Sequence, residues 1–268
     1  KSTGIEQPDD LDELLDLVEK QILVTPGCSV ETIQDRVEEA LMQRGHYQVA
    51  KNFILYREKR TELRTCRLAL SVATGDSDLD GCLFEIQNDF KAPEYSLEVL
   101  TAKFNSQVSP TASVDEKLDT LIRSAVELTT QNAPRYEQIA GRLLCHSFKR
   151  KLAQREQNLG LTDFYTKLMF LTEHGLYGKY ILENYTKEEI DEAAGLIDEN
   201  RNKLFNYSGL QLVLERYVIK SHNNEILESP QELFLGVALH LAMPEKKDVR
   251  MQYVKRFYDM LSKLEVTM

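Results

Sequence analysis

Hydrophobic residues along this chain recur mostly at the three- and four-residue spacing of amphipathic helices. From Ser29 to about Gln43, an inner face carries Ile33, Val37 and Leu41. Gly45 ends that stretch, and a long helical pattern follows over residues 47–73. The same spacing predicts an earlier helix at 8–19 and later ones at 96–105, 113–130, 133–157, 162–173, 186–197, 210–215, 229–243 and 249–264.

Several of these helices carry start signals. Ser29 is a predicted N-cap, because its hydroxyl can accept a hydrogen bond from the first turn. A Ser or Thr followed three residues later by Glu predicts a capping box. At expected helix starts this pattern occurs at Ser113 with Glu116, Thr186 with Glu189, and Ser229 with Glu232, the last with Pro230 at the first helical position.

Two segments depart from the helical pattern. Residues 217–227 place branched and aromatic residues on both sides of Asn223-Asn224, which predicts a small β-hairpin. Residues 75–81 are polar and bounded by glycines, which predicts a linker and a domain boundary. The expected fold is therefore mainly α, with one small β-hairpin.

Composition narrows the function. Hydrophobic residues make up 42% and charged residues 28%, as in ordinary soluble globular proteins. A net charge of -10 argues against a large nucleic-acid footprint but permits one small anionic ligand in a local basic site. We expect no membrane partner, because no apolar run reaches the length of a membrane span. The four cysteines and five histidines show no metal-ligand spacing, and we expect reduced thiols, no metal site and a cytoplasmic location.

The candidate chemistry is limited. Lys51, Arg57, Lys59 and Arg60 line one helix and offer cations to a triphosphate. Acids lie between these cations, so the helix can also be a solvated face with intrahelical ion pairs. The residues alone favour this second interpretation. We predict no catalytic residue, since paired acids such as Glu188-Glu189 fall at helix starts, where the helix dipole explains them.

A family resemblance adds what the residues do not show. Residues 30–38 (VETIQDRVE) and 50–60 (AKNFILYREKR) resemble the second half of an ATP-cone, a small regulatory nucleotide-binding domain. Residues 183–189 (ENYTKEE), 225–231 (EILESPQ) and 251–259 (MQYVKRFYD) resemble the N-terminal helical region of the large subunit of class I ribonucleotide reductase. The implied organisation is a partial ATP-cone at 1–74, a linker at 75–93, and the large-subunit N-terminal helical domain at 94–268.

The resemblance also implies an effector site and its ligands. Val30 and Gln34 on one helix, with Tyr56 and Lys59 on the next, fall where cones approach the nucleotide. The implied effectors are ATP and dATP, with Mg. Val30 and Gln34 depart from the Thr and His of some cones, which leaves the effector preference open. The cone's basic hairpin and first helix lie outside the matching residues, so we expect this half cone to bind nucleotide weakly or not at all.

The implied parent is a ribonucleoside-diphosphate reductase, which reduces ribonucleotides to deoxyribonucleotides under ATP and dATP control. Its implied partners are a small radical-generating subunit, further copies of the large subunit, and thioredoxin or glutaredoxin as reductant. Its catalytic barrel falls outside this chain. The alternative is a free-standing helical nucleotide-sensing or interaction module without catalysis. A cone-bearing transcriptional regulator would need the CxxC pairs of a zinc ribbon, which this sequence lacks.

Overall fold

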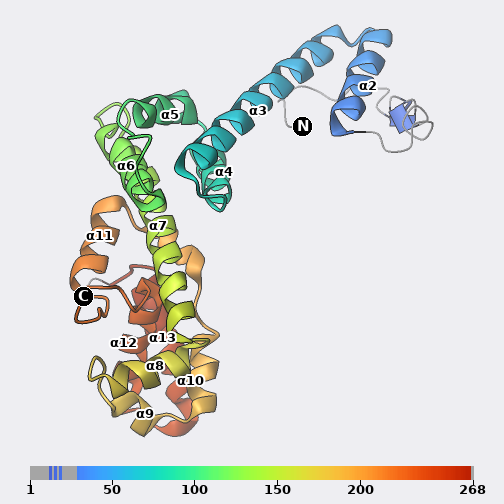
Figure 1. Cartoon of the computed structure of the whole chain (residues 1–268). Coiled ribbons are helices and arrows are strands. Elements are labelled where there is room, and N and C mark those ends of the chain that lie inside the picture. Colours follow the sequence, from blue (N-terminus) through green and yellow to red (C-terminus); the bar gives the residue numbers. More distant parts are fainter. Residues whose placement is uncertain (1–11, 14, 17, 20–28, 267–268) are drawn as a thin grey trace. The chain divides into compact units, whose positions relative to one another are not determined.

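The computed structural model describes residues 12–13, 15–16, 18–19 and 29–266. The chain divides into two compact units between Ala69 and Leu70, and the long helix α3 (Tyr47–Thr74) runs through this division (Figure 1). Most of the helix expected at residues 8–19 lies outside the described residues. The first unit contains α2 (Val30–Gln43) and the larger part of α3.

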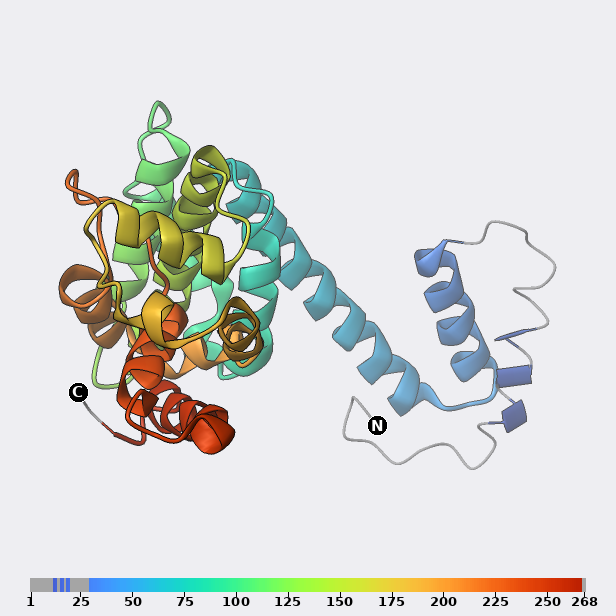
Figure 2. The same ribbon diagram turned by 90° about the horizontal axis from the view of Figure 1, so that it is seen from below.

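In the first unit, α2 and α3 form a helical hairpin (Figure 2). The predicted cap at Ser29 is confirmed, since its hydroxyl accepts a hydrogen bond from the Thr32 amide at 3.2 Å. Gly45 has φ of +79°, a left-handed conformation that suits glycine and lets the chain reverse. The two helices bury a small apolar cluster built around Ala40, Leu41 and Ala50.

The second unit is built from helices and short 3₁₀ turns. In chain order its α-helices are α4 (Leu79–Asp89), α5 (Leu97–Asn105), α6 (Val114–Glu127), α7 (Tyr136–Leu159), α8 (Phe164–Glu173), α9 (Tyr180–Asn184), α10 (Lys187–Ala194), α11 (Tyr207–Arg216), α12 (Pro230–Ala242) and α13 (Lys247–Ser262). The 3₁₀ turns are η1 (Pro93–Tyr95) and η2 (Glu199–Leu204). The mainly α prediction is confirmed.

Helix α7 is the long element against which much of this unit packs. It lies against α6 and, at Gly141, against the segment leading into α11 (Figure 1). A Cβ at Gly141 would come within 2.8 Å of the Asn206 carbonyl carbon, so only glycine permits this close approach. Farther along the chain, Phe164, Leu168, Leu235, Leu239, Val254 and Tyr258 join one large apolar core.

All three predicted capping boxes are present. Ser113, Thr186 and Ser229 each accept a hydrogen bond from the amide three residues on, and the Glu carboxylate at that position accepts one from the cap amide. Ser96 also caps α5. Helices that begin with this chemistry therefore start where their sequences predict.

The predicted β-hairpin is present only as a single antiparallel bridge between Lys220 and Ile226, which is less regular structure than the sequence predicts. Within the described residues no strand forms. The reason is local. The Ile219 amide donates to the Glu228 carboxylate at 3.1 Å, so a side chain replaces the next rung of the ladder.

The segment expected as a linker, residues 75–93, contains helix α4. Leu79, Leu83 and Ile86 of this helix are fully buried, at the spacing of one helical face. The next residue with a large side chain, Phe90, lies under the guanidinium groups of Arg135 and Arg142, at 4.5 and 5.3 Å from its ring centre. The segment is therefore a folded part of the second unit, bounded by the polar turn at 75–78.

Candidate nucleotide-effector site

The four residues expected to contact the effector lie on the helical hairpin of the first unit. Val30 is the first residue of α2 and is 65% exposed, and Gln34 follows one turn later on the same side. Tyr56 and Lys59 are three residues apart on α3, with Tyr56 half-buried and Lys59 exposed. All four lie toward the end of the hairpin that is remote from the Gly45 turn.

Arg57 fixes α2 and α3 relative to each other. Its guanidinium donates to Asp35 at 2.9 Å and also forms a short contact with Glu38, both on α2. The hydrogen bond to Glu38 is the main cause that raises the pKa of Arg57 above its ordinary value. Among the cations of α3, Arg57 therefore holds α2 and α3 together and is not available to a ligand.

Arg60 lies against Tyr56 one turn earlier. Its guanidinium carbon is 5.7 Å from the ring centre, and its Nη1 atom is 3.4 Å from the phenol oxygen. Lys59 beside it forms no ion pair within the described residues. The structure therefore places one free ammonium next to a stacked Tyr–Arg pair, and Arg60 joins the candidate site through the i,i+4 spacing that the sequence already contained.

The first turn of α2 contains Glu31, an acid that was not among the expected site residues. Hydrogen bonds from its own backbone N–H and from the Ser29 hydroxyl lower the pKa of the Glu31 carboxyl. The positive charges of Arg64 and Arg57 on α3 act in the same direction. This carboxylate occupies the N-terminus of α2, where backbone N–H groups would otherwise be available to a phosphate.

The structure brings the four expected residues onto one hairpin without joining them directly. Within the described part of the chain, no hydrogen bond or ion pair links any two of Val30, Gln34, Tyr56 and Lys59. The coupling of Glu31 to Arg57 and Arg64 shows that the start of α2 and the middle of α3 lie close together. The arrangement can hold an anionic ligand at Lys59 and Arg60, provided that the ligand avoids Glu31.

Two of the described cysteines, Cys82 and Cys145, are poor nucleophiles. Cys82 and Cys145 are free thiols, and Cys28 lies outside the described residues. Burial raises the pKa of Cys82 to about 12 and that of Cys145 to about 11, so both stay protonated at neutral pH. Over the same part of the chain, no three His, Cys, Asp or Glu side chains gather as a metal site would require.

Comparison with known proteins matches both ends of the chain to described families. Residues 2–62 match the ATP cone domain, and residues 203–268 match the domain described as "Ribonucleotide reductase, all-alpha domain". The second match begins in η2 and includes α11, α12 and α13.

Similar full-length proteins agree with these matches. The ribonucleoside-diphosphate reductase subunit alpha of Treponema pallidum (strain Nichols) is 48% identical over 238 residues, covering 89% of this chain and 28% of the relative. The ribonucleoside-diphosphate reductase 1 subunit alpha of Escherichia coli (strain K12) is 32% identical over 151 residues, covering 56% of this chain and 19% of the relative. The corresponding subunit of Haemophilus influenzae (strain ATCC 51907 / DSM 11121 / KW20 / Rd) is 31% identical, with 56% and 20% covered.

The helical fold agrees with these two matches, one to an ATP cone domain and one to an all-α reductase domain. This chain is similar to the N-terminal region of ribonucleoside-diphosphate reductase alpha subunits. It spans only 19–28% of the length of the three relatives. Among the described residues, no helix combines the length and apolar character needed to cross a membrane.

Proposed function

We propose that this chain is the regulatory and helical N-terminal part of a ribonucleoside-diphosphate reductase large subunit. The complete enzyme would reduce ribonucleotides to deoxyribonucleotides in the cytoplasm, under activation by ATP and inhibition by dATP. Its partners would be a small radical-generating subunit, further large subunits, and thioredoxin or glutaredoxin. The 48% identity that extends over 89% of this chain supports this proposal.

In this proposal, the effector binds across the open end of the α2–α3 hairpin. The supporting observation is the contrast between neighbouring cations: Arg57 is paired with two acids of α2, whereas Lys59 is exposed and unpaired within the described residues. A free ammonium is suited to a phosphate group, because it has no carboxylate partner to give up on binding.

The other residues have complementary roles in the proposal. Arg60 supplies a second cation, held by its contact with the Tyr56 ring. Val30 offers an apolar surface, and the Gln34 amide can both donate and accept hydrogen bonds toward a sugar or base. Mg would accompany the nucleotide through the phosphate oxygens.

Glu31 gives the site a repulsive element. Its carboxylate lies at the start of α2 and keeps phosphate away from those N–H groups, so the phosphates are directed to Lys59 and Arg60 instead. A ligand with a compensating Mg ion would tolerate Glu31 better than a bare triphosphate.

Isothermal titration of the chain with Mg-ATP and Mg-dATP tests the proposal. We expect weak binding, in the high micromolar to millimolar range, and a loss of at least about fivefold in affinity in Lys59→Ala, as for one charge-assisted contact. Lys51→Ala is the matched control, since Lys51 is an exposed lysine on the same helix near the turn. Equal losses in both variants, or no binding at millimolar nucleotide, would overturn the site.

A further inference from the structure

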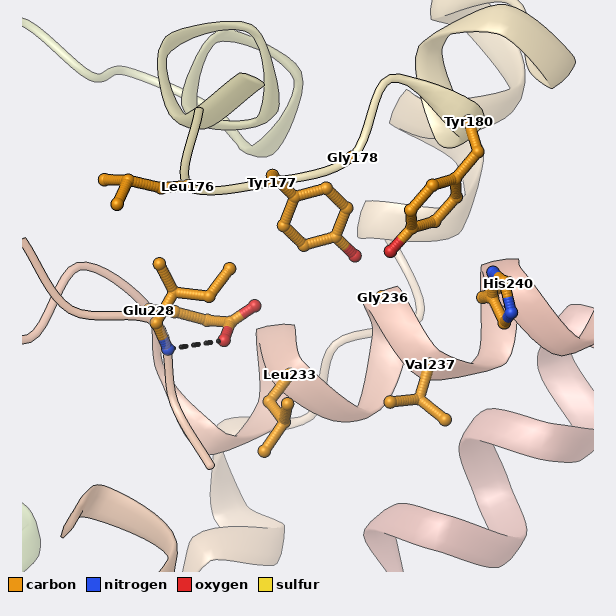
Figure 3. A pocket seen from close by; sticks show the side chains of 10 residues that line it. Leu176, Tyr177, Gly178, Tyr180, Glu228, Leu233, Gly236, Val237 and His240 are labelled. Carbon is orange, nitrogen blue, oxygen red and sulfur yellow. Dashed lines mark hydrogen bonds between the residues drawn. The ribbon is translucent and has the colours of Figure 1, made fainter. Parts of the chain in front are cut away.

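The second unit contains a cavity of about 310 Å³ beside helix α12 (Figure 3). One wall is the loop that connects α8 to α9, the floor is one face of α12, and one end is closed by the bridge segment. The lining residues are Leu176, Tyr177, Gly178, Tyr180, Ile219, Glu228, Leu233, Gly236, Val237 and His240. A cavity of this size accommodates a ligand group of several heavy atoms.

Two glycines allow two tyrosine hydroxyls to converge on this cavity. A Cβ at Gly236 would lie 2.4 Å from the Tyr177 hydroxyl, and a Cβ at Gly178 would lie 2.1 Å from Cε1 of Tyr180. The Tyr177 and Tyr180 rings are 5.9 Å apart, and His240 meets Tyr180 edge-on at 4.9 Å. Aromatic faces and edges therefore surround the mouth of the cavity.

A buried acid forms the inner end of the cavity. Glu228 is 3% exposed, and one of its carboxylate oxygens accepts the Ile219 amide at 3.1 Å. Within the described residues no donor reaches its other oxygen. The walls between this carboxyl and the rings are aliphatic, from Leu176, Leu233 and Val237.

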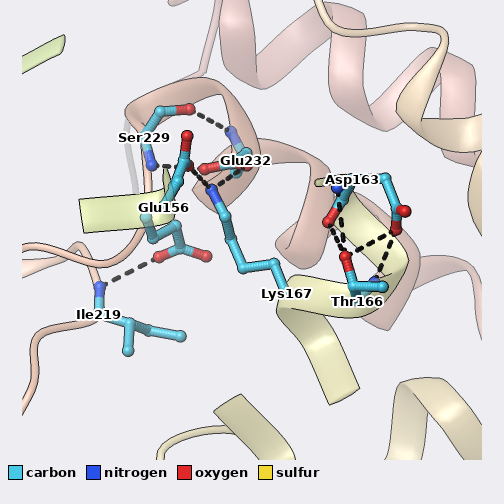
Figure 4. Close-up of polar contacts among 8 residues, drawn as sticks. Glu156, Asp163, Thr166, Lys167, Ile219, Ser229 and Glu232 are labelled. Atoms are coloured by element: carbon cyan, nitrogen blue, oxygen red, sulfur yellow. Dashed lines mark hydrogen bonds and ion pairs between the residues drawn. The ribbon is translucent and has the colours of Figure 1, made fainter. Parts of the chain in front are cut away.

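The charges around Glu228 leave an excess of acid. Lys167 of α8 is the nearby cation, and it already forms ion pairs with Glu156 of α7 and Glu232 of α12 (Figure 4). The ammonium near Glu228 is thus already paired with two other carboxylates, and Glu228 forms no ion pair with it within the described residues. Burial, reinforced by the Glu232 carboxylate, raises the pKa of Glu228 to about 8, although the Ile219 N–H and Lys167 oppose the shift. At neutral pH Glu228 is therefore mainly protonated, because no second cation neutralises its carboxylate.

We propose that this cavity binds an alkylammonium or guanidinium group, with its charge at the Glu228 carboxylate and between the Tyr177 and Tyr180 rings. The acid supplies the counter-charge, the rings supply cation–π attraction, and the aliphatic wall contacts the alkyl stem. A bare metal ion fits less well, since it would need several oxygen ligands and Glu228 is the only carboxylate among the described residues that line the cavity.

The geometry makes binding dependent on proton loss. A cation beside Glu228 favours its carboxylate form, so binding expels the proton that the acid otherwise holds. Lys167 stays paired with its two acids, and burial raises the pKa of Tyr177 and keeps it neutral. The other titratable side chains that line the cavity are Tyr180 and His240. An alkylammonium also stays charged, since its pKa is about 10.4.

Calorimetry with n-butylammonium and ethylguanidinium on the 268-residue chain tests this proposal. Titrations in phosphate and in HEPES at about pH 7 count the protons released, and we expect close to one per bound cation. The affinity should rise about tenfold between pH 7 and pH 9, as Glu228 ionises in the free protein. Uncharged n-butanol, of similar size, should not bind.

Three variants distinguish the contributions of Glu228 and of the Tyr180 ring from the effect of removing any acidic side chain. Glu228→Gln should lose at least about tenfold in affinity and release no proton, and Tyr180→Leu should weaken binding while proton release persists. Glu173→Gln, at an exposed acid of α8, should behave as the parent chain. No binding by either cation, binding that releases no proton, or equal binding of n-butanol would overturn the proposal.

A last comparison identifies the source of the cation. Nα-acetyl-lysine N-methylamide presents the same ammonium on a polypeptide backbone. Affinity equal to that of n-butylammonium would identify the ligand as a lysine side chain of a protein, and affinity more than about tenfold weaker would identify it as a small free amine.

Discussion

The buried acid of the second unit predicts an unusual dependence of its stability on pH. The pKa of Glu228 lies at about 8 in the folded chain, against an ordinary value of 4.5. The folded state therefore binds the proton more tightly than the unfolded state. Glu228 stabilises the fold fully below about pH 4.5, and this stabilisation is lost as pH rises through about 8.

The magnitude follows from the two pKa values. Their difference corresponds to about 5 kcal/mol over the whole window, at 1.36 kcal/mol per unit. Between about pH 5.5 and pH 7.5 the loss comes to about 2.5 kcal/mol. The residue is 3% exposed, so solvent screening reduces this effect little.

Urea unfolding followed by far-UV circular dichroism at several pH values measures this loss. The parent chain should lose about 2.5 kcal/mol more than Glu228→Gln over that pH range, because glutamine keeps the shape of the side chain and does not titrate. Glu173→Gln, with its exposed side chain, should follow the parent. If Glu228→Gln shows the same pH dependence as the parent chain, the reasoning about the buried acid is refuted.

Three further changes have defined outcomes. Lys167→Met should cost about 3–5 kcal/mol in urea unfolding, since it leaves two carboxylates facing each other without their ammonium; a cost below about 1 kcal/mol would contradict this. Gly141→Ala should destabilise the second unit by about 1–3 kcal/mol, because its Cβ meets backbone at 2.8 Å, and an unchanged urea midpoint would show that the helices can separate without cost. Glu31→Gln should strengthen dATP binding about two- to fivefold in calorimetry by removing a like charge, and weaker binding would show that the acid supports the ligand.

Most of the fold could be predicted because capping residues close in sequence determine where several helices begin. Ser113, Thr186 and Ser229 cap their helices through side chains three residues away, and no distant contact is needed. The linker prediction failed for the opposite reason. Glycines and acids dominate residues 75–81, but burial of Leu79, Leu83 and Ile86 against the rest of the unit outweighs that polar signal.

The hairpin prediction shows how one side chain can change a local pattern. Branched residues and an Asn-Asn turn favour a two-stranded ladder, and the Lys220–Ile226 bridge does form. The Glu228 carboxylate then takes the Ile219 amide that would extend the ladder. A glutamate directly after a predicted strand gives no sign in sequence that it folds back in this way.

The candidate effector site is predictable only in part. The helical positions of Val30, Gln34, Tyr56 and Lys59 follow from periodicity, and the structure places them on one hairpin. Which cation is free does not follow, since the choice between Arg57 and Lys59 depends on acids carried by the other helix. The excess of acid around Glu228 is likewise invisible in sequence, because Glu156, Lys167 and Glu232 come from three separate helices.

The central claim is that a nucleotide effector binds the α2–α3 hairpin at Lys59. Amide hydrogen exchange with and without saturating Mg-dATP tests it most directly, because it locates binding along the chain. We predict added protection in peptides that cover the start of α2 and residues 56–60, and its loss in Lys59→Ala. Protection confined to the second unit, or protection of the hairpin that persists in Lys59→Ala, would contradict the account.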